Sequence, residues 1–415
     1  MESRVSTTLI DDFVDRRTAE ARTRRPAWAR CVSVDRLTLT DFRCFAHLRL
    51  SVAAGPVVLT GPNGVGKTSV LEALSFLAPG RGLRRARLDD VARWRPDLGV
   101  APVWSVAARM RVPDGSVELA TGRDAAATGP QRERRVVKID GQMAKSQTAL
   151  AGVLGVTWLT PDMDRLFIES AATRRRFLDR LVFGFDPGHA ERVGAYERAM
   201  RERSRLLRQG SADTLWLAAL EDIMARHGVA TAAGRRDTAE RLTAAGSEGV
   251  GPFPGAILEI DGTVERWLDE EPALAVETRL RQRLEASRRI DAETGGAAEG
   301  PHKSDLLVRH GTTGRMAGMC STGEQKALLI AIVLAGARAQ AAAERALPLV
   351  LLDEVAAHLD GRHRAGLFDL VTAMGVQAWY TGTERGVFQP LAGRAQFLTV
   401  ENAAVTPAMD RRGRG

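Results

Sequence analysis

The chain has 415 residues, of which 44% are hydrophobic and 27% charged, and such a composition is typical of a globular protein with a sizeable core. It has no apolar run of about 18 residues, and residues 1–30 mix arginines with acids, so neither a membrane-spanning helix nor a secretory signal is expected. A net charge of +8 favours a polyanionic partner. The three cysteines are scattered and suggest no disulfide framework. We therefore expect a cytoplasmic protein without a membrane partner.

The first predicted elements are strands. Residues 1–31 are expected to form a disordered tail, and hydrophobic residues then alternate from 32 to 50, which predicts paired strands. Strand-like segments within 100–140 predict an edge sheet. The apolar run PVVLT at 56–60 predicts a buried parallel strand that leads into a glycine-rich turn.

That turn, GPNGVGKT, fits the phosphate-loop pattern G-x-x-x-x-G-K-[ST], with a predicted helix at 68–77 behind it. Its glycines let backbone N–H groups face phosphate oxygens, and the positive end of the helix points to the same place. Lys67 is expected to reach the β and γ phosphates of ATP, and Thr68 to ligate Mg²⁺. The predicted nucleotide-binding residues of the loop are Gly61, Pro62, Asn63, Gly64, Val65, Gly66, Lys67 and Thr68.

A helical region follows. Asp186-Pro187 is a helix-start signal, and hydrophobic spacing predicts one helix to Gly210, a second over 214–226 and a third ending near 245. The glycine-rich stretch 246–255 is a break. Because no heptad pattern continues through four repeats, a long coiled coil is not expected. The predicted head is discontinuous and consists of residues 32–185 and 256–400. The predicted helical arm is 186–255, and the predicted basic tail is 401–415.

The most hydrophobic predicted strand is LPLVLLDEV at 347–355. We expect it in the centre of the sheet, beside the phosphate-loop strand. Asp353 at its tip would then hold Mg²⁺, directly or through water, and Glu354 would polarise the attacking water. An acidic pair that caps a strand is common, and the preceding phosphate loop is what favours the catalytic interpretation.

The stretch CSTGEQKALLIAIVLAG at 320–336 predicts a helix that begins with Ser-Thr-Gly-Glu-Gln. It resembles the signature motif of ABC-type ATPases, written LSGGQ, which closes over the ATP held by a second subunit. The resemblance implies that Ser321 and Gly323 contact the nucleotide of a partner copy. AAHLD at 356–360 resembles the D-loop, which implies that Asp360 lies at the dimer seam. A helix cap is the alternative role of Ser321.

Three further segments narrow the family. LTLTDFRCF at 37–45, the stretch 159–187 and GPHKSDL at 300–306 are similar to the RecF family of bacterial recombination mediators, from about Val34 to Val400. The interval from Lys67 to Asp353 agrees, because it is longer than in a transporter subunit and shorter than in a coiled-coil chromosome-condensing protein. Lys303 and Ser304 depart from the Arg and Asp of the family.

The resemblance implies an α/β fold: an ABC-type P-loop ATPase head, with a mixed sheet flanked by helices, and an inserted helical lid. It implies an ATP-induced homodimer that binds single- and double-stranded DNA at gaps and junctions through phosphates. RecR and RecO are the implied partners, and RecA loading, replication restart and the SOS response the implied roles. Arg43 would lie near the nucleotide phosphates. The arginines expected to contact DNA are Arg174, Arg175, Arg176, Arg201, Arg203 and Arg205.

The stretch Thr381-Gly382-Thr383 stands at the switch position without a histidine, which predicts slow ATP hydrolysis rather than rapid turnover. The family resemblance implies that this weak ATPase activity is DNA-stimulated. Gln142 and Gln147 are the candidates for the glutamine loop. Two other classes stay open. A transporter ATP-binding subunit would show a switch histidine and a cleft for a membrane partner, and a metabolic kinase or GTPase-like switch would not need 320–336.

Overall fold

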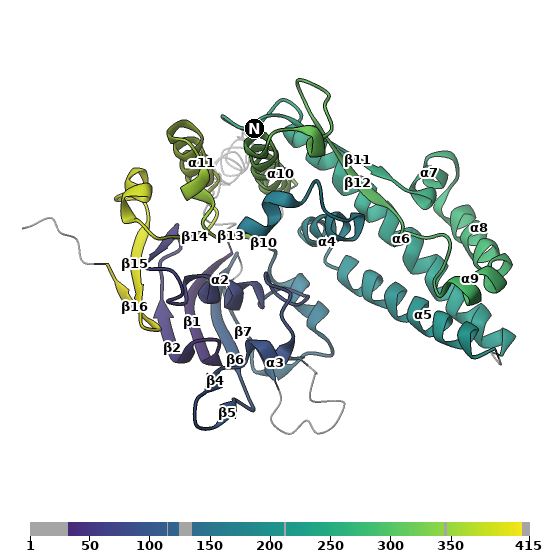
Figure 1. Cartoon of the computed structure of the whole chain (residues 1–415), viewed down its shortest axis with the longest axis horizontal. Coiled ribbons are helices and arrows are strands. Elements are labelled where there is room, and N and C mark those ends of the chain that lie inside the picture. Colours follow the sequence, from purple (N-terminus) through teal and green to yellow (C-terminus); the bar gives the residue numbers. More distant parts are fainter. Residues whose placement is uncertain (1–31, 114, 124–134, 211–212, 344–346, 409–415) are drawn as a thin grey trace, which may run out of the picture.

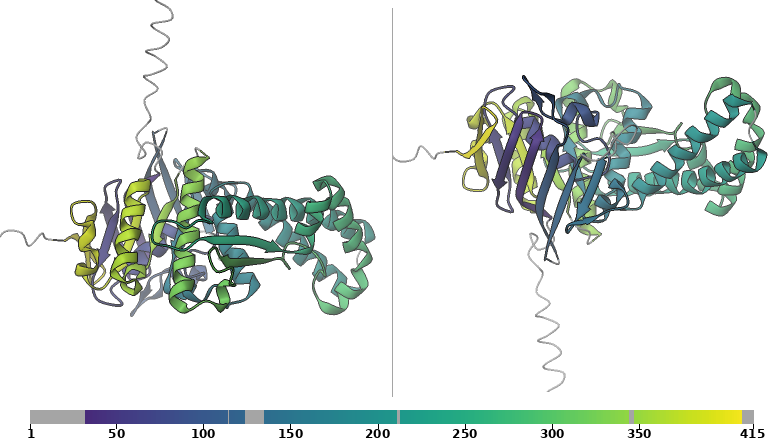
Figure 2. Two further views of the ribbon diagram at one scale, coloured as in Figure 1. Left: turned by 90° about the horizontal axis from the view of Figure 1, so that it is seen from above. Right: turned by 90° about the horizontal axis from the view of Figure 1, so that it is seen from below.

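The computed structural model describes residues 32–113, 115–123, 135–210, 213–343 and 347–408. It consists of a head, in which helices lie against two six-stranded sheets, and a helical arm that projects from one side of the head (Figure 1). The views from above and below show the same projection (Figure 2). The tail expected at 1–31 lies outside the described residues.

The first sheet is antiparallel, in the order β2-β1-β6-β7-β8-β9. Alternation of buried and exposed residues, as in β1 with Val34, Leu37 and Leu39 buried, places one face on the core. Its strands are β1 Ser33–Phe42, β2 Phe45–Ser51, β6 Ser105–Val112, β7 Gly115–Arg123, β8 Arg135–Ile139 and β9 Gln142–Met143. The paired strands expected over 32–50 and within 100–140 are thereby confirmed.

The second sheet has the order β10-β13-β14-β3-β15-β16 and is parallel except for its last pair. Its strands are β3 Val57–Thr60, β10 Val156–Leu159, β13 Leu349–Leu352, β14 Ala378–Gly382, β15 Gln396–Glu401 and β16 Ala404–Pro407. All of β3 and β13 is buried, as expected for strands covered on both faces. One prediction is wrong: β13 is not beside β3, because β14 lies between them. The predicted tail at 401–415 contributes β16 within its described part.

Helices separate and cover the sheets. α2, Lys67–Ser75, lies between the two sheets, and its Val70, Leu71 and Leu74 share a core with alternate residues of β3 and β13. On the opposite face, α10 Thr322–Ala342 and α11 Gly361–Met374 pack against the other residues of the same strands. The remaining short head elements are α3 Leu88–Val91, β4 Trp94–Arg95 and β5 Gly99–Val100.

The arm is larger than the sequence predicted. α5 His189–Gln209 runs outward, and α6 Thr214–Gly246 is one helix where two were expected. The helices α7 Thr263–Glu270, α8 Ala273–Ala286 and α9 Arg288–Thr294 belong to the same unit. One hydrophobic cluster extends from Tyr196 to Ala297, so the predicted arm boundary at 255 is not where the packing changes. The antiparallel pair β11 Ala256–Asp261 and β12 Asp305–His310 carries the chain between arm and head.

A buried ion-pair network joins arm to head at α4, Ala171–Val182. The carboxylate of Asp179 accepts hydrogen bonds from Arg235 of α6 at 2.7 and 2.9 Å and pairs with His189 of α5 at 2.8 Å. Arg235 also donates to the carbonyl of Pro301 at 2.6 Å. Such buried pairs fix one relative position because breaking them leaves an uncompensated charge.

Within the ranges given above, none of the helices has the length and apolar character needed to cross a bilayer.

Candidate nucleotide-binding site

The phosphate loop requires glycine at two points of close approach. A Cβ on Gly61 would lie 2.2 Å from the carbonyl oxygen of Val400, and one on Gly66 would lie 2.7 Å from the Sγ of Cys44. Gly66 also has φ 111°, a conformation that side chains rarely adopt. Gly64 faces open space on its Cβ side. The loop is therefore backed by the fold and open toward the outside, as a phosphate cradle must be.

Lys67 begins α2 and is only 4% exposed. Its ammonium group donates to the carbonyls of Gly61 and Pro62, each at 2.7 Å. Burial lowers the pKa of Lys67, while the nearby charges of Glu354 and Asp353 raise it. The cation is thus held at the mouth of the loop, close to the acidic pair that the sequence singled out.

Asp353 lies at the end of β13 and receives two hydroxyl hydrogen bonds. Thr68 Oγ1 donates to its Oδ1 at 3.0 Å and Thr381 Oγ1 at 2.7 Å. Burial raises the pKa of Asp353, against the opposing effect of these hydrogen bonds. The hydroxyl of Thr68 and the carboxylate are hard oxygen ligands, so these residues fit the expected Mg²⁺ once nucleotide oxygens and water complete the coordination.

Glu354 follows in an unusual backbone conformation, with φ 54° and ψ 12°. Its backbone N–H donates to Thr381 Oγ1 at 2.9 Å. A left-handed non-glycine residue costs on the order of 1 kcal/mol and recurs at functional sites. This conformation turns the chain sharply after Asp353, at the end of β13.

Thr381 is a residue whose role sequence reasoning missed. It had been noted only as the switch position that lacks a histidine, yet its hydroxyl bridges Asp353 and the Glu354 backbone. The signal available in the sequence was its place at the end of a strand parallel to β13. The predicted strand order placed β13 directly beside β3. In the structure β14 lies between them, so Thr381 of β14 stands next to Asp353.

Arg43 reaches the phosphate-loop helix through a carboxylate. Its guanidinium forms a two-pronged pair with Glu72 of α2, at 2.7 and 2.6 Å, and Glu72 is fully buried. Arg84 lies 3.7 Å from the same carboxylate. A direct contact between Arg43 and phosphate stays a prediction, and the structure gives Arg43 a first role in holding α2.

The signature segment begins α10 with a capping box. The Glu324 carboxylate accepts from the Ser321 N–H and hydroxyl at 2.8 and 2.9 Å, and the Glu324 N–H points to Ser321 Oγ at 3.3 Å. Ser321 therefore has the capping role weighed above. Ser321 and Gly323 are nevertheless exposed, and nothing lies within 4 Å of a Cβ built on Gly323. The helix N-terminus is open to a ligand from outside.

Asp360 caps α11, accepting from the His363 N–H at 2.9 Å and pairing with His363 Nδ1 at 2.7 Å. Its side chain is exposed. A surface pocket of about 330 Å³ is lined by Gly323, Glu324 and His363, so the 321 and 360 segments open onto one face. A contact with a partner's nucleotide stays a prediction for all three of Ser321, Gly323 and Asp360.

The six arginines expected to contact DNA do not form one exposed surface. Arg203 is fully buried and pairs with Glu221 at 2.9 Å and Asp291 at 2.7 Å, so it is not available to DNA and that prediction is wrong. Arg174 is bound by both oxygens of Asp305.

The other four arginines differ in how strongly they are held. Arg175 donates to the carbonyl of Ser304. Arg201 and Arg205 are exposed and pair with Glu197 and Glu202 on their own helix. Arg176 is exposed and donates to Thr173.

Of the two glutamine-loop candidates, Gln142 is exposed in β9, and Gln147 accepts from Arg135 at 3.1 Å and from the Gly80 N–H at 3.3 Å. Neither has a described contact with the phosphate loop. Among the described residues there is also no cluster of three or more His, Cys, Asp or Glu that could hold a metal by itself.

Comparison with known proteins places the chain among relatives of similar length. The family described as RecF/RecN/SMC N terminal domain matches residues 33–400. The DNA replication and repair protein RecF of Mesorhizobium japonicum is 48% identical over 379 residues, covering 91% of this chain and 98% of that protein. The protein of the same name from Rhizobium etli is 44% identical, with 90% and 98% covered.

Solved structures agree in fold. A structure of the recombination mediator protein RecF with ATP has a TM-score of 0.76 at 18% identity, covering 91% of this chain and 98% of that one. The Smc head domain of Pyrococcus furiosus has a TM-score of 0.51 at 14% identity, covering 91% and 96%. The predicted fold class, an ABC-type ATPase head, is confirmed, and the chain belongs to the RecF family.

Proposed function

We propose that this protein binds DNA in recombinational repair as a dimer whose two copies close over ATP. The observation that carries the proposal is the separation of two half-sites. Lys67, Thr68 and Asp353 meet at one end of the parallel sheet, whereas the exposed N-terminus of α10 lies on a different element and shares no described contact with them. A second copy would supply the missing half.

Each residue then has a defined task. Lys67 and the loop N–H groups bind phosphate oxygens, Thr68 and Asp353 hold Mg²⁺, and Glu354 positions the attacking water. Ser321 and Gly323 of the partner would close over the γ-phosphate, with Asp360 at the seam. Mg²⁺ supplies charge stabilisation for the transferred phosphoryl group. Hydrolysis would be weak and DNA-stimulated, and ATP would favour the dimer because it binds that state better.

The pathway follows from the family. The relatives are DNA replication and repair proteins, and the solved neighbour is a recombination mediator of the RecFOR pathway. RecR and RecO are the partners in this proposal, and RecA loading, replication restart and the SOS response its setting, in the cytoplasm where bacterial DNA lies. We set aside the transporter alternative because the chain belongs to the RecF family.

The test is a DNA-binding titration of two variants with and without ATP. Lys67→Ala should lose nucleotide binding, ATP-dependent dimerisation and the ATP-dependent part of DNA affinity. Ser321→Arg should bind nucleotide normally and yet stay monomeric and bind DNA weakly. A Ser321→Arg protein that dimerises with ATP like the wild type would contradict the proposal, as would a wild-type protein whose mass is unchanged by ATP.

A further inference from the structure

A groove runs between head and arm beside α4. Its head wall comes from residues 79–85 and 145–148, and its arm wall comes from α4 and α5. Its volume is about 820 Å³. The cationic side chains that line it come from both walls and are Arg81, Arg85, Lys145, Arg176, Arg180 and Arg198.

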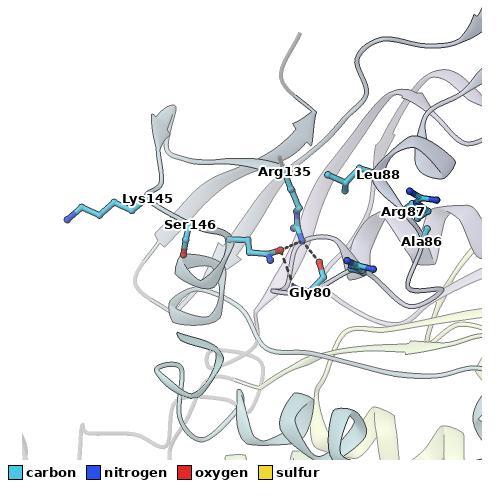
Figure 3. Close-up of a pocket in the computed structure, with 9 residues that line it drawn as sticks. Gly80, Ala86, Arg87, Leu88, Arg135, Lys145 and Ser146 are labelled. Atoms are coloured by element: carbon cyan, nitrogen blue, oxygen red, sulfur yellow. Dashed lines mark hydrogen bonds between the residues drawn. The ribbon is translucent and has the colours of Figure 1, made fainter. Parts of the chain in front are cut away.

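A second pocket, of about 620 Å³, continues the groove on the head side. The two pockets share Gly80, Arg81 and the segment 145–147. Figure 3 shows the Arg135 guanidinium of this second pocket directed toward the carbonyl of Gly80, with Lys145 extending away from the other labelled residues. The cationic lining is thus continuous over both pockets.

Two of these arginines lack an acidic partner within the described chain. Arg180 stacks on Trp158, with its guanidinium carbon 3.9 Å from the ring centroid, and its Nε has no hydrogen-bond partner. Arg135 donates to the hydroxyl of Thr121, to the side chain of Gln147 and to the carbonyls of Phe76, Ala78 and Gly80. Burial lowers the pKa of each guanidinium to about 9, so both remain cations at neutral pH.

The cations also repel one another. Arg85 lies close enough to Arg176 and Arg180 for like-charge repulsion to count at each site, and at Arg85 the carboxylate of Glu169 opposes this repulsion. Arg85 adopts φ 53°, a left-handed conformation that is costly for a long side chain. An unpaired cluster held against repulsion is stabilised when an anion enters it.

The acids at the groove do not cancel this charge. Asp179 also lines it but is already paired with Arg235 and His189. Glu191 and Glu197 are the two others, and Glu197 lies 3.5 Å from Arg201. The groove therefore carries a net positive charge that side chains of the described chain leave uncompensated.

We propose that this groove binds the phosphate chain of single-stranded DNA, an inference that rests on the proposed DNA-binding function. A volume of about 820 Å³ is that of a small-molecule pocket, which admits a few nucleotides of one strand and excludes a double helix. Phe183 lies in the lining beside the cations, and aromatic side chains next to a cationic track are how proteins bind single strands.

Because the walls come from both head and arm, a bound strand would also pin the arm to the head. A duplex that ends in a single-stranded overhang would then be held at two places, the duplex on the dimer and the overhang in the groove. The protein should distinguish such a substrate from a blunt duplex through phosphate contacts alone, without reading bases.

The test compares two double variants in the full chain with ATP. Lys145→Glu with Arg198→Glu reverses one exposed charge on each wall. Arg111→Glu with Arg226→Glu makes the same change of net charge on head and arm outside the groove lining. Affinity is measured over a range of salt for a blunt duplex and for the same duplex with a single-stranded overhang.

The groove variant should bind the overhang substrate about tenfold more weakly, with a salt slope smaller by roughly 1.4, because each single-strand phosphate contact contributes about 0.7. Its affinity for the blunt duplex should match that of the control variant. Equal losses on both substrates, or equal losses in both variants, would overturn the inference.

Two further readings separate the possible failures. The number of ATP molecules bound per chain should be the same in wild type and groove variant, and loss of a second ATP in the variant would mean that the groove holds free nucleotide instead. If wild-type protein shows no ATP-dependent binding of either DNA, the proposed function itself fails. If wild type binds DNA in an ATP-dependent way and the groove variant binds the overhang substrate as tightly as the control variant does, the inference alone fails.

Discussion

The hydroxyl of Thr381 lies between Asp353 and the backbone of Glu354. Its hydrogen bond to the Asp353 carboxylate, at 2.7 Å, is shorter than that of Thr68, at 3.0 Å. A buried carboxylate that must bind a metal needs its orientation fixed before the metal arrives. Thr381 provides that orientation from a neighbouring strand, whereas Thr68 belongs to the phosphate loop itself. Thr381 is therefore a positioning residue.

Replacing Thr381 with valine keeps the shape of the side chain and removes both hydrogen bonds. We expect ATP hydrolysis to fall about 10- to 100-fold, the usual cost of losing a partner of a metal ligand, and the free Mg²⁺ concentration that gives half-maximal activity to rise. Steady-state hydrolysis over a Mg²⁺ series measures this. Thr399→Val, on β15, is the matched control, and an equal loss there would contradict the assignment.

Arg203 illustrates a buried cation with a structural role. Its replacement by alanine leaves Asp291 without its charged partner, and removing one member of a buried pair costs about 3–5 kcal/mol. We expect Arg203→Ala to lower the free energy of unfolding by that amount, measured by chemical denaturation. Arg205→Ala, two residues away and exposed, should leave the free energy of unfolding nearly unchanged. If Arg203→Ala kept normal stability and lost DNA affinity, Arg203 would be a DNA-contacting residue rather than a structural one.

The local motifs were predictable from the sequence because their chemistry depends on neighbouring residues in the chain. Gly61 to Thr68 form the turn and begin α2 within one segment, and Asp353 directly follows its own strand. The burial of Arg203 was not predictable, since its partners at 221 and 291 come from other helices. Thr381 was missed for the same reason: its partner is defined by strand order.

Among the elements, the segment Gly300–Ser304 lies where the arm meets the head. His302 Nδ1 accepts from the Tyr196 hydroxyl at 2.6 Å, and its Nε2 donates to the Ala297 carbonyl at 3.0 Å. Ser304 donates to both oxygens of Glu265, at 2.7 and 2.8 Å. Ser304 stands where the family has Asp, at a buried position. Its neutral hydroxyl donates to Glu265, whereas a second carboxylate there would repel Glu265.

Burial lowers the pKa of His302 to about 4, although its hydrogen bond to Ala297 opposes the shift. Below about pH 6.5 the unfolded chain takes up a proton that the folded chain refuses until about pH 4. We expect stability to fall over that window by on the order of 1 kcal/mol per pH unit from this residue.

Denaturation curves at several pH values test the His302 prediction. His302→Gln should flatten the fall between pH 6.5 and pH 4, and replacement of the exposed His47 should not. An unchanged slope in His302→Gln would mean that the imidazole stays accessible to protons in the folded state.

Helix boundaries within the arm show what periodicity can and cannot give. The spacing predicts one helix to Gly210, a second over 214–226 and a third ending near 245, whereas the last two form the single helix α6. Gly228 and Gly234 lie inside this helix without breaking it. These glycines allow close contact with α5. A Cβ on Gly228 would lie 3.1 Å from the Tyr196 ring, and one on Gly234 would lie 3.2 Å from the His189 ring. Tertiary packing overrides the local preference.

Over the whole molecule, the proposed dimer has two composite sites, each with Lys67 from one copy and Ser321 from the other. An equimolar mixture of Lys67→Ala and Ser321→Arg proteins should therefore regain up to about half of wild-type ATP hydrolysis, since neither variant dimerises with itself and each mixed dimer has one intact site out of two. Either protein alone should be inactive. Steady-state hydrolysis of the mixture measures this.

The control mixture combines Lys67→Ala with Asp353→Asn, two changes in the same half-site. Every site in such mixed dimers lacks one of the two groups, so no activity should return. Recovery in the control, or a fully inactive first mixture with demonstrable mixed dimers, would count against independent composite sites.

The 33-residue helix α6 links the outermost part of the molecule to the signature helix. At its inner end Gly246 packs so closely on α10 that a Cβ would lie 2.9 Å from that of Ala335. At 1.5 Å per residue the helix is about 50 Å long, so a rotation of about 6° at the inner end displaces the far tip by about 5 Å. A small rotation of α10 against Gly246 would therefore move the tip of the arm by about the pitch of one helical turn.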